Sequence, residues 1–392
     1  DAFEQPGFSR DRPEEVWLNV ALGRAGALGV RPWRPVPNDT VDFSPRVGFA
    51  WDVLGRGKAA VRGSYGIFRD RISSVSLRGA VASYNGLYTQ GVELANPTFF
   101  PAVPNAAGLP VSAISTTSVP SPAGDTPFTQ QSSLGFEYAV SPRMTVSADY
   151  VHLLGLGFQM IRNVNAPLPL GQTGGRRVCP FGDALRARGL PECFQMQMQH
   201  DMSNRIHLNA LTMRLERRFA NRVGFLLGYT LGSVKTWSTG AFGTVPTDSN
   251  DLFKPLDFGP SDNDVRHRFT GNVIYELPYR INVAAIVTAN SAAPYNQTTG
   301  RDDNLDFVLN DRPAGVRFNS LRGDGLFNTD LRLSKKFFLD RTRNVELMWE
   351  MFNLFNTVNL ADFNGNERAA TFLQARAALP PFQAQLGIRF SF

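Results

Sequence analysis

The final twelve residues, PFQAQLGIRFSF at 381–392, alternate between apolar and polar side chains up to a terminal phenylalanine. An extended chain places every second residue on the same face. One face therefore gathers Phe382, Ala384, Leu386, Ile388, Phe390 and Phe392, and the other gathers glutamine, arginine and serine. Soluble domains usually end in a frayed polar tail. This ending predicts a β-strand with one face in an apolar medium and the other in water.

The same alternation recurs in segments that pair across short connections, and we count about eleven such strands. The clearest pair is 46–53 and 58–68, which are separated by one glycine-containing turn. At the opposite ends the connections are long and rich in Gly, Pro, Asn and Asp. These long loops are expected at 71–126, 156–203, 236–263, 291–325 and 357–380.

Short turns at one end and long loops at the other are typical of outer-membrane β-barrels. A soluble sandwich has no such asymmetry, and loops of this length are uncommon in a compact soluble domain. No apolar run reaches the ~18–20 residues that a membrane-spanning helix requires. The sequence predicts an all-β fold, an antiparallel up-and-down transmembrane barrel over 44–392. Residues 1–43 are expected to be an extracellular loop or the remnant of a preceding strand.

Single-chain bacterial barrels close with an even number of antiparallel strands. An odd count of about eleven favours an incomplete barrel. In that case the 46–53 strand and the 382–392 strand each keep one unpaired edge.

The charge balance gives no support for a nucleic-acid partner. The net charge is +6, but lysine and arginine are spread along the chain without a basic run. Only 19% of the residues are charged, which is below the roughly 25% of an ordinary soluble domain. Basic side chains that face anionic lipid or line a pore explain this balance equally well.

Several stretches together resemble one family. They are FSPRVGFAWDVLGRGKAAVRGSYGIFRD at 43–70, then DVRHRFTGNVIYELP, PYNQTTGRDDNLDFVLNDRPAGV, NTDLRLSKKF and FNLFNTVN. In this order they resemble the barrel of TonB-dependent outer-membrane receptors, in particular the Oar-like branch, over about 43–392.

The resemblance implies a barrel of about 22 strands around a plugged lumen, of which this chain would supply the C-terminal half. It implies uptake of a scarce nutrient, with the TonB complex acting through a plug that lies outside these residues. Outer-membrane lipid and lipopolysaccharide would surround the barrel. The assembly machinery would recognise the last strand through Leu386, Ile388, Phe390 and Phe392. A structural or adhesive envelope barrel and a passive porin-like channel are the alternatives.

Charged residues at alternate strand positions are expected to face the barrel interior, because charges that face lipid cost about 2–4 kcal/mol each near the midplane. We favour a salt-linked wall over substrate contacts for them. They are Arg46, Arg62, Glu137, Arg214, Glu216, Arg268, Glu276, Asp330, Arg332, Glu346, Glu350 and Arg389.

Two loop motifs could each form a metal site, but each can also be explained by a purely structural role. Asp302, Asn304 and Asp306 have the alternate spacing of calcium ligands, although Phe307 replaces the expected glycine and a loop held by Asx turns is favoured. Met196, Met198, His200 and Met202 could bind copper, or they could simply extend a strand.

Cys179 and Cys193 are the only cysteines. A disulfide that closes a loop is favoured over two free thiols. All five tryptophans are most simply explained as core or interface anchors. Trp237, which begins a long loop, is the one we would test for ligand contact.

No nucleophile elbow, zinc-protease helix or phosphate loop is present in the sequence. We therefore expect no enzymatic activity and no cofactor.

Overall fold

The computed structural model of the chain describes residues 43–70, 126–163, 166, 201–239, 245–306 and 308–392, with the backbone alone at 116–120 and 196–200. Within these residues, eleven antiparallel strands follow one another in chain order through a single sheet. They are β1 (Arg46–Asp52), β2 (Ala59–Arg69), β4 (Phe128–Ser141), β5 (Met144–Asn163), β6 (Met196–Ala220), β7 (Val223–Thr236), β9 (His267–Leu277), β10 (Ile281–Asn290), β13 (Leu326–Phe338), β14 (Asn344–Phe352) and β17 (Gln383–Ser391).

Six short strands lie outside this path. β3 (Thr116–Pro120) runs parallel to β6, and β8 (Gly259–Pro260) pairs with the end of β7. Two small hairpins form within the loops, one from β11 (Pro294–Tyr295) and β12 (Leu321–Arg322), the other from β15 (Leu360–Phe363) and β16 (Ala375–Ala378). No described helix is long and apolar enough to cross a membrane.

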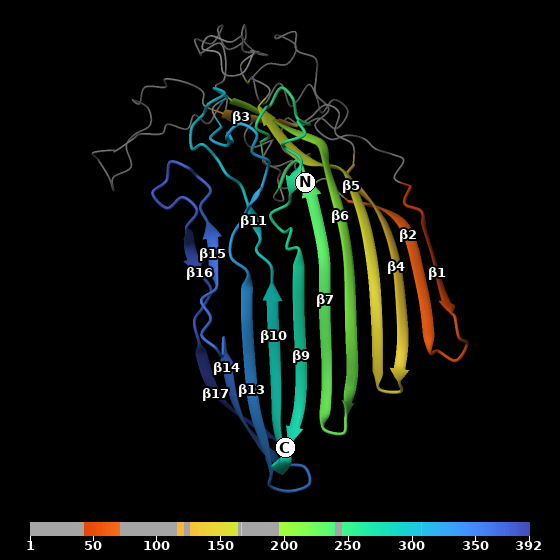
Figure 1. Ribbon diagram of the computed structural model, residues 1–392. Coiled ribbons are helices and arrows are strands. Elements are labelled where there is room, and N and C mark those ends of the chain that lie inside the picture. The colour runs from red at the N-terminus through yellow and green to blue at the C-terminus, as the bar shows by residue number, and fades with distance from the viewer. Residues whose placement is uncertain are drawn as a thin grey trace, which may run out of the picture.

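The turns confirm the predicted asymmetry. Short turns join β1 to β2, β4 to β5, β6 to β7, β9 to β10 and β13 to β14, all at the lower end of the sheet in Figure 1, and the loops gather at the upper end. Asn221 and Arg222 both have positive φ values, 53° and 67°, as Tyr279 and Arg280 do at 63° and 57°. Asn221 and Arg222 form a two-residue turn, which matches the twist of β6 and β7. The β9–β10 turn has three residues, Pro278–Arg280, between the paired Leu277 and Ile281.

One predicted loop boundary is wrong. The sequence placed a loop at 156–203, but β5 continues to Asn163 and β6 begins at Met196. The two strands go on pairing beyond irregularities at Gly155, Phe158 and Met160, which keeps their backbone groups hydrogen-bonded to each other. The local composition of this stretch resembles a loop, and only the pairing between the two strands reveals the extension.

The two faces of the sheet differ as predicted. Cross-strand pairs place Leu386 beside Trp349 and Ile388 beside Leu347, on what we call the apolar face. The opposite, polar face pairs Arg389 with Glu346. The registers of all eleven strands place the twelve charged residues predicted to face the interior on this polar face.

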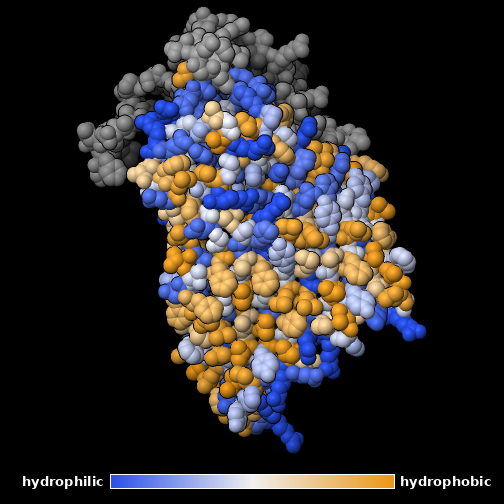
Figure 2. Space-filling model, in the orientation of Figure 1, coloured by the Kyte–Doolittle hydropathy of each residue, from blue (hydrophilic) through white to orange (hydrophobic). Residues whose placement is uncertain are grey.

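Apolar side chains lie largely on the outside. Within the described residues only Ala59, Met160, Ala166, Phe318 and Met351 form a buried hydrophobic set, whereas Leu386 is 82% exposed. Figure 2 shows hydrophobic residues over much of the lower part of the sheet and hydrophilic residues over the loops. An apolar surface of this extent requires a lipid or protein environment.

Ion pairs join the polar face across strands. Arg332 of β13 reaches both Glu346, at 3.7 Å, and Glu350, at 3.3 Å, on β14. Glu346 also lies 3.8 Å from Arg389 of β17, and Arg62 pairs with Glu137 at 3.2 Å. These contacts are those of the salt-linked wall that the sequence favoured.

The first and last strands do not pair with each other. Among the described residues β1 pairs only with β2, and β17 pairs only with β14. As far as the described strands go, the predicted unpaired edges of β1 and β17 are therefore confirmed. Residues 1–42 lie outside the described residues, so the interpretation of 1–43 stays a prediction.

Candidate functional site

A cavity of about 610 Å³ lies at the loop end of the sheet. Its walls come from three connections, the β7–β9 loop (237–266), the β10–β13 loop (291–325) and the β14–β17 loop (353–382). Asn290 and Leu326 line it from the ends of β10 and β13, where they pair on the polar face. The cavity is therefore continuous with the polar side of the sheet.

Backbone contacts fix the first two loops against each other. The Phe318 N–H donates to Leu256 O at 2.9 Å, and Arg322 donates to both the carbonyl and the carboxylate of Asp264, each at 2.5 Å. A Cβ at Gly259 would lie 2.1 Å from Phe318 O. Only glycine permits this approach of the two backbones.

The third loop joins the second through a short parallel bridge between Thr298 and Asn366. Thr298 N donates to Gly365 O at 2.9 Å, and Glu367 N donates to Thr298 O at 3.0 Å. A Cβ at Gly365 would stand 1.8 Å from Asn296 O. The three loops therefore form one hydrogen-bonded cap around the cavity.

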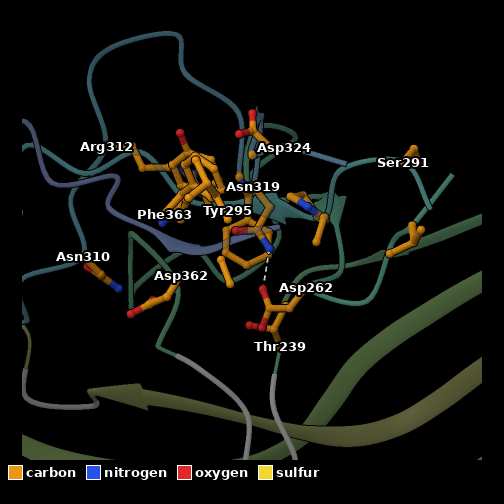
Figure 3. Close-up of a pocket in the computed structure, with 18 of the residues that line it drawn as sticks. Thr239, Asp262, Ser291, Tyr295, Asn310, Arg312, Asn319, Asp324, Asp362 and Phe363 are labelled. Atoms are coloured by element: carbon orange, nitrogen blue, oxygen red, sulfur yellow. Dashed lines mark hydrogen bonds between the residues drawn. The ribbon is translucent and has the colours of Figure 1, made fainter. Parts of the chain in front are cut away.

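Aromatic rings form part of the cavity wall (Figure 3). Tyr295 and Phe363, from different loops, stack with ring centroids 5.7 Å apart. Trp237 also lines the cavity and packs against two phenylalanines. Its ring centroid lies 4.1 Å from that of Phe258 and 5.7 Å from that of Phe253. Its indole N–H is buried and has no hydrogen-bond partner. The structure thus places Trp237 in the site, while its contact with a ligand stays a prediction.

The charged groups leave the cavity acidic. Asp257 is buried and paired with Arg312, and Asp362 is paired with Arg376 at 2.7 Å. Two further lining carboxylates, Asp262 and Asp324, form no ion pair within the described residues.

Asp262, Asp324 and Tyr295 contribute polar groups to the cavity wall. Asp262 accepts a hydrogen bond from Asn319 Nδ2 at 2.7 Å, which is drawn in Figure 3. Burial, helped by the nearby Asp324 carboxylate, raises the pKa of Tyr295. The phenol therefore stays protonated at neutral pH and is available as a donor.

The 302–306 motif forms turns within the second loop of this cap. The Asp306 N–H donates to both Asp302 Oδ1 and Asn304 Oδ1, each at 2.9 Å, and Val308 N donates to Asp306 Oδ1 at 2.9 Å. These are the Asx-type bonds that the sequence favoured over calcium. No cluster of three or more acidic, histidine or cysteine side chains able to hold a metal occurs in the described part of the chain. Calcium binding at 302–306 stays a prediction.

Burial changes the acidity of this motif. Desolvation raises the pKa of Asp306 to about 7, and the Asp302 and Asp311 carboxylates add to the shift. Desolvation likewise raises the pKa of Asp311, against hydrogen bonds from the backbone of Asp303 and Asn304. Asp306 is completely buried, and its Oδ2 has no hydrogen-bond partner.

The structure does not test the remaining site predictions, which concern copper binding, the disulfide and the assembly signal. The first five residues of β6, which include Met196, Met198 and His200, are described by their backbone alone. Met202 lies further along that strand. The predicted copper site therefore stays untested. Cys179 and Cys193 lie outside the described residues. The proposed assembly residues of β17 are exposed on the apolar face, Phe392 to 92%.

Sequence reasoning missed most of the cavity wall. Tyr295 lies within the family-like stretch that begins PYNQTTG, which is the one signal that could have drawn attention to it. Asp262, Asp324 and Phe363 come from three separate loops and carry no motif. Their convergence is visible only in the folded chain.

Comparison with known proteins identifies the architecture. A family model described as outer membrane beta barrel domain matches residues 7–316 and 287–385. The comparison with curated proteins found no match. The outer membrane transporter YddB from Escherichia coli has a TM-score of 0.58 at 11% identity, over 89% of this chain and 40% of that one.

The FrpB iron transporter from Neisseria meningitidis (F3-3 variant) has a TM-score of 0.50 at 9% identity, over 89% of this chain and 39% of that one. Similarity at such identity concerns the fold alone. The chain spans about 40% of the length of these two structures.

Proposed function

Because the chain belongs to the outer membrane beta barrel domain family, we propose that it forms part of a TonB-dependent receptor of the Oar-like branch that takes up a scarce nutrient. The protein is located in the cell outer membrane. The observation that carries the proposal is the cavity, which three outer loops build on the polar side of the sheet. A receptor needs such a site between its outer loops and its lumen.

The mechanism follows from this placement. The three-loop cap would capture the nutrient, and the charged polar wall below it would line the path inward. Energy delivered by the TonB complex would move a plug that belongs to another part of the receptor. Lipid and lipopolysaccharide would contact the apolar face, and the assembly machinery would recognise β17. We propose neither a nucleic-acid partner nor an enzymatic reaction.

Growth under nutrient limitation tests this proposal. A strain that lacks the gene and a strain that lacks TonB would be compared across limiting sources of iron, carbon, nitrogen and vitamins. We expect the gene deletion to reproduce a subset of the defects of the TonB deletion. Uptake that persists without TonB would indicate a passive channel. An adhesion defect with no nutritional defect would indicate a structural or adhesive barrel.

A further inference from the structure

The cavity has the charge and surface of a site for a neutral or cationic polar ligand. We propose that it binds a small saccharide, neutral or carrying amino groups. This inference rests on the proposed uptake function and names the substrate class of the same site. It depends on the unpaired carboxylates, the stacked rings and the amide groups that the three loops bring together.

Charge excludes an anionic chelate as the natural occupant. The Arg312 guanidinium is neutralised by Asp257, and no other lining residue is basic. Asp262 and Asp324 contribute two carboxylates that form no ion pair with the residues the structure describes. A ferric tris-catecholate carries several negative charges, which these carboxylates would repel. A neutral or amine-bearing ligand meets no such repulsion.

The aromatic surface suits a sugar ring. A pyranose exposes C–H groups on its faces and hydroxyl groups around its edge. Tyr295 and Phe363 supply two stacked aromatic rings to the cavity wall. The Tyr295 hydroxyl and the exposed Asp324 carboxylate both line the cavity. They supply a donor and an acceptor for ligand hydroxyls.

Asparagine side chains supply the remaining polar groups of the cavity wall. Asn290, Asn296, Asn310 and Asn319 all line the cavity, each from a segment fixed by the cap. Hydrogen bonds hold Asn310 to Val245 O at 2.8 Å and Asn319 to Pro260 O at 3.0 Å. These bonds use the amide N–H groups of both residues, so each can offer a ligand hydroxyl only its Oδ1 acceptor, and the Oδ1 of Asn310 is buried without a partner. Acceptors held in place in this way bind at little entropic cost. The volume of about 610 Å³ lies within the ordinary range of small-ligand sites.

Binding by the full-length receptor, purified in detergent, tests the inference by calorimetry. The probes are cellotriose, maltotriose, a glucosamine trimer and a ferric tris-catecholate chelate. The variants are Tyr295→Ala and Asp324→Asn. The matched controls are Phe355→Ala and Asp251→Asn, which change exposed residues of the other two loops of the cap that do not line the cavity. We expect at least one saccharide to bind, each cavity variant to weaken it at least tenfold, and the controls to bind normally.

Three outcomes would overturn the inference. They are binding of the ferric chelate in preference to every saccharide, saccharide binding that ignores both cavity variants, and no binding of any saccharide. None of them depends on TonB. A saccharide that binds as expected but enters cells lacking TonB would instead refute the uptake proposal and leave this site intact.

Discussion

The stretch FNLFNTVN at 352–359 contains three asparagines whose side chains hydrogen-bond to the backbone near the loop ends of β13, β14 and β17. Asn359 is 4% exposed, and it both accepts from Phe327 N at 2.8 Å and donates to Phe327 O at 2.9 Å. The amide thus imitates a strand neighbour. Asn353 binds Thr357 in both directions in the same manner, at 2.9 Å each. These contacts explain in physical terms why the motif combines asparagines with apolar residues.

The substitution Asn359→Asp is expected to destabilise this junction. A carboxylate cannot donate to Phe327 O, and leaving a buried acceptor unpaired costs about 1–3 kcal/mol. The temperature at which the folded band is lost in heat-modifiability gels should fall, and it should recover partly at low pH, where the carboxyl regains a proton. Asn356→Asp is the matched control, because Asn356 uses only its Oδ1, which accepts from Phe382 N at 3.0 Å. Equal losses in both variants would contradict this account.

The Asp306 carboxyl is expected to make the 302–311 turns weaken as pH rises. Its folded pKa of about 7 lies above the ordinary value of 3.8. Between about pH 4 and pH 7, the Asp306 carboxyl is therefore protonated in the folded state and ionised in the unfolded state. Stability is highest below this window, falls through it and stays low above pH 7. The full shift of about three units corresponds to an upper limit of about 4 kcal/mol.

Hydrogen exchange provides the measurement for Asp306. After correction for intrinsic rates, the amides of Asp306 and Val308 should exchange faster at pH 8 than at pH 5. In Asp306→Asn this pH dependence should largely disappear. Asp251→Asn, which removes an exposed carboxylate from a neighbouring loop, should keep it. A pH dependence that survives Asp306→Asn would rule out this carboxyl as its source.

At the scale of elements, strand length and edge exposure matter most. β5 spans 20 residues and β6 spans 25, whereas a membrane-crossing strand needs only about 9–11. Their outer halves therefore rise beyond the apolar belt and support the loops. β17, in contrast, has only nine residues. Its apolar face is exposed along its length, and among the described residues its outer edge is unpaired.

Deleting Phe392 from the full-length protein is expected to reduce its assembly into the outer membrane several-fold. The residue is 92% exposed and stacks on Phe390 with centroids 5.9 Å apart, so it contributes little to the internal stability of the sheet. Its loss should act on recognition and pairing during assembly. Quantification of folded protein in outer-membrane fractions checks this result. Tyr279→Ala, at another exposed aromatic of the same end, should assemble normally, and normal assembly of the deletion would refute the role of the last residue.

At the scale of the whole molecule, the chain is an antiparallel sheet with a hydrogen-bonded cap at one end. The sheet separates an apolar face from a charged one, and the cavity of the cap adjoins the charged face at Asn290 and Leu326. Figure 1 shows the loops gathered at one end of the sheet. Buried residues are mostly polar, such as Asp257, Asp306 and Asn353. The cap is therefore held by hydrogen bonds rather than by an apolar core, which suits the polar ligand that we propose for it.

The sequence alone determined the sheet. Period-2 alternation fixes which face each strand residue occupies, and turn length fixes which strands are neighbours, so the eleven strands and the inward charges could be predicted. These are local patterns, readable over a few residues. The end of β5 and the start of β6 could not be read in this way, because that extension depends on pairing between strands.

Only the tertiary structure decided the site. Trp237 could be singled out from its position, but Tyr295, Asp324 and Phe363 became a site only when three loops met. That meeting depends on backbone contacts such as Gly365 against Asn296, between residues about 70 positions apart in the chain. Contacts over such separations leave no periodic trace in the sequence, whereas an alternating strand carries its own pattern at every second residue.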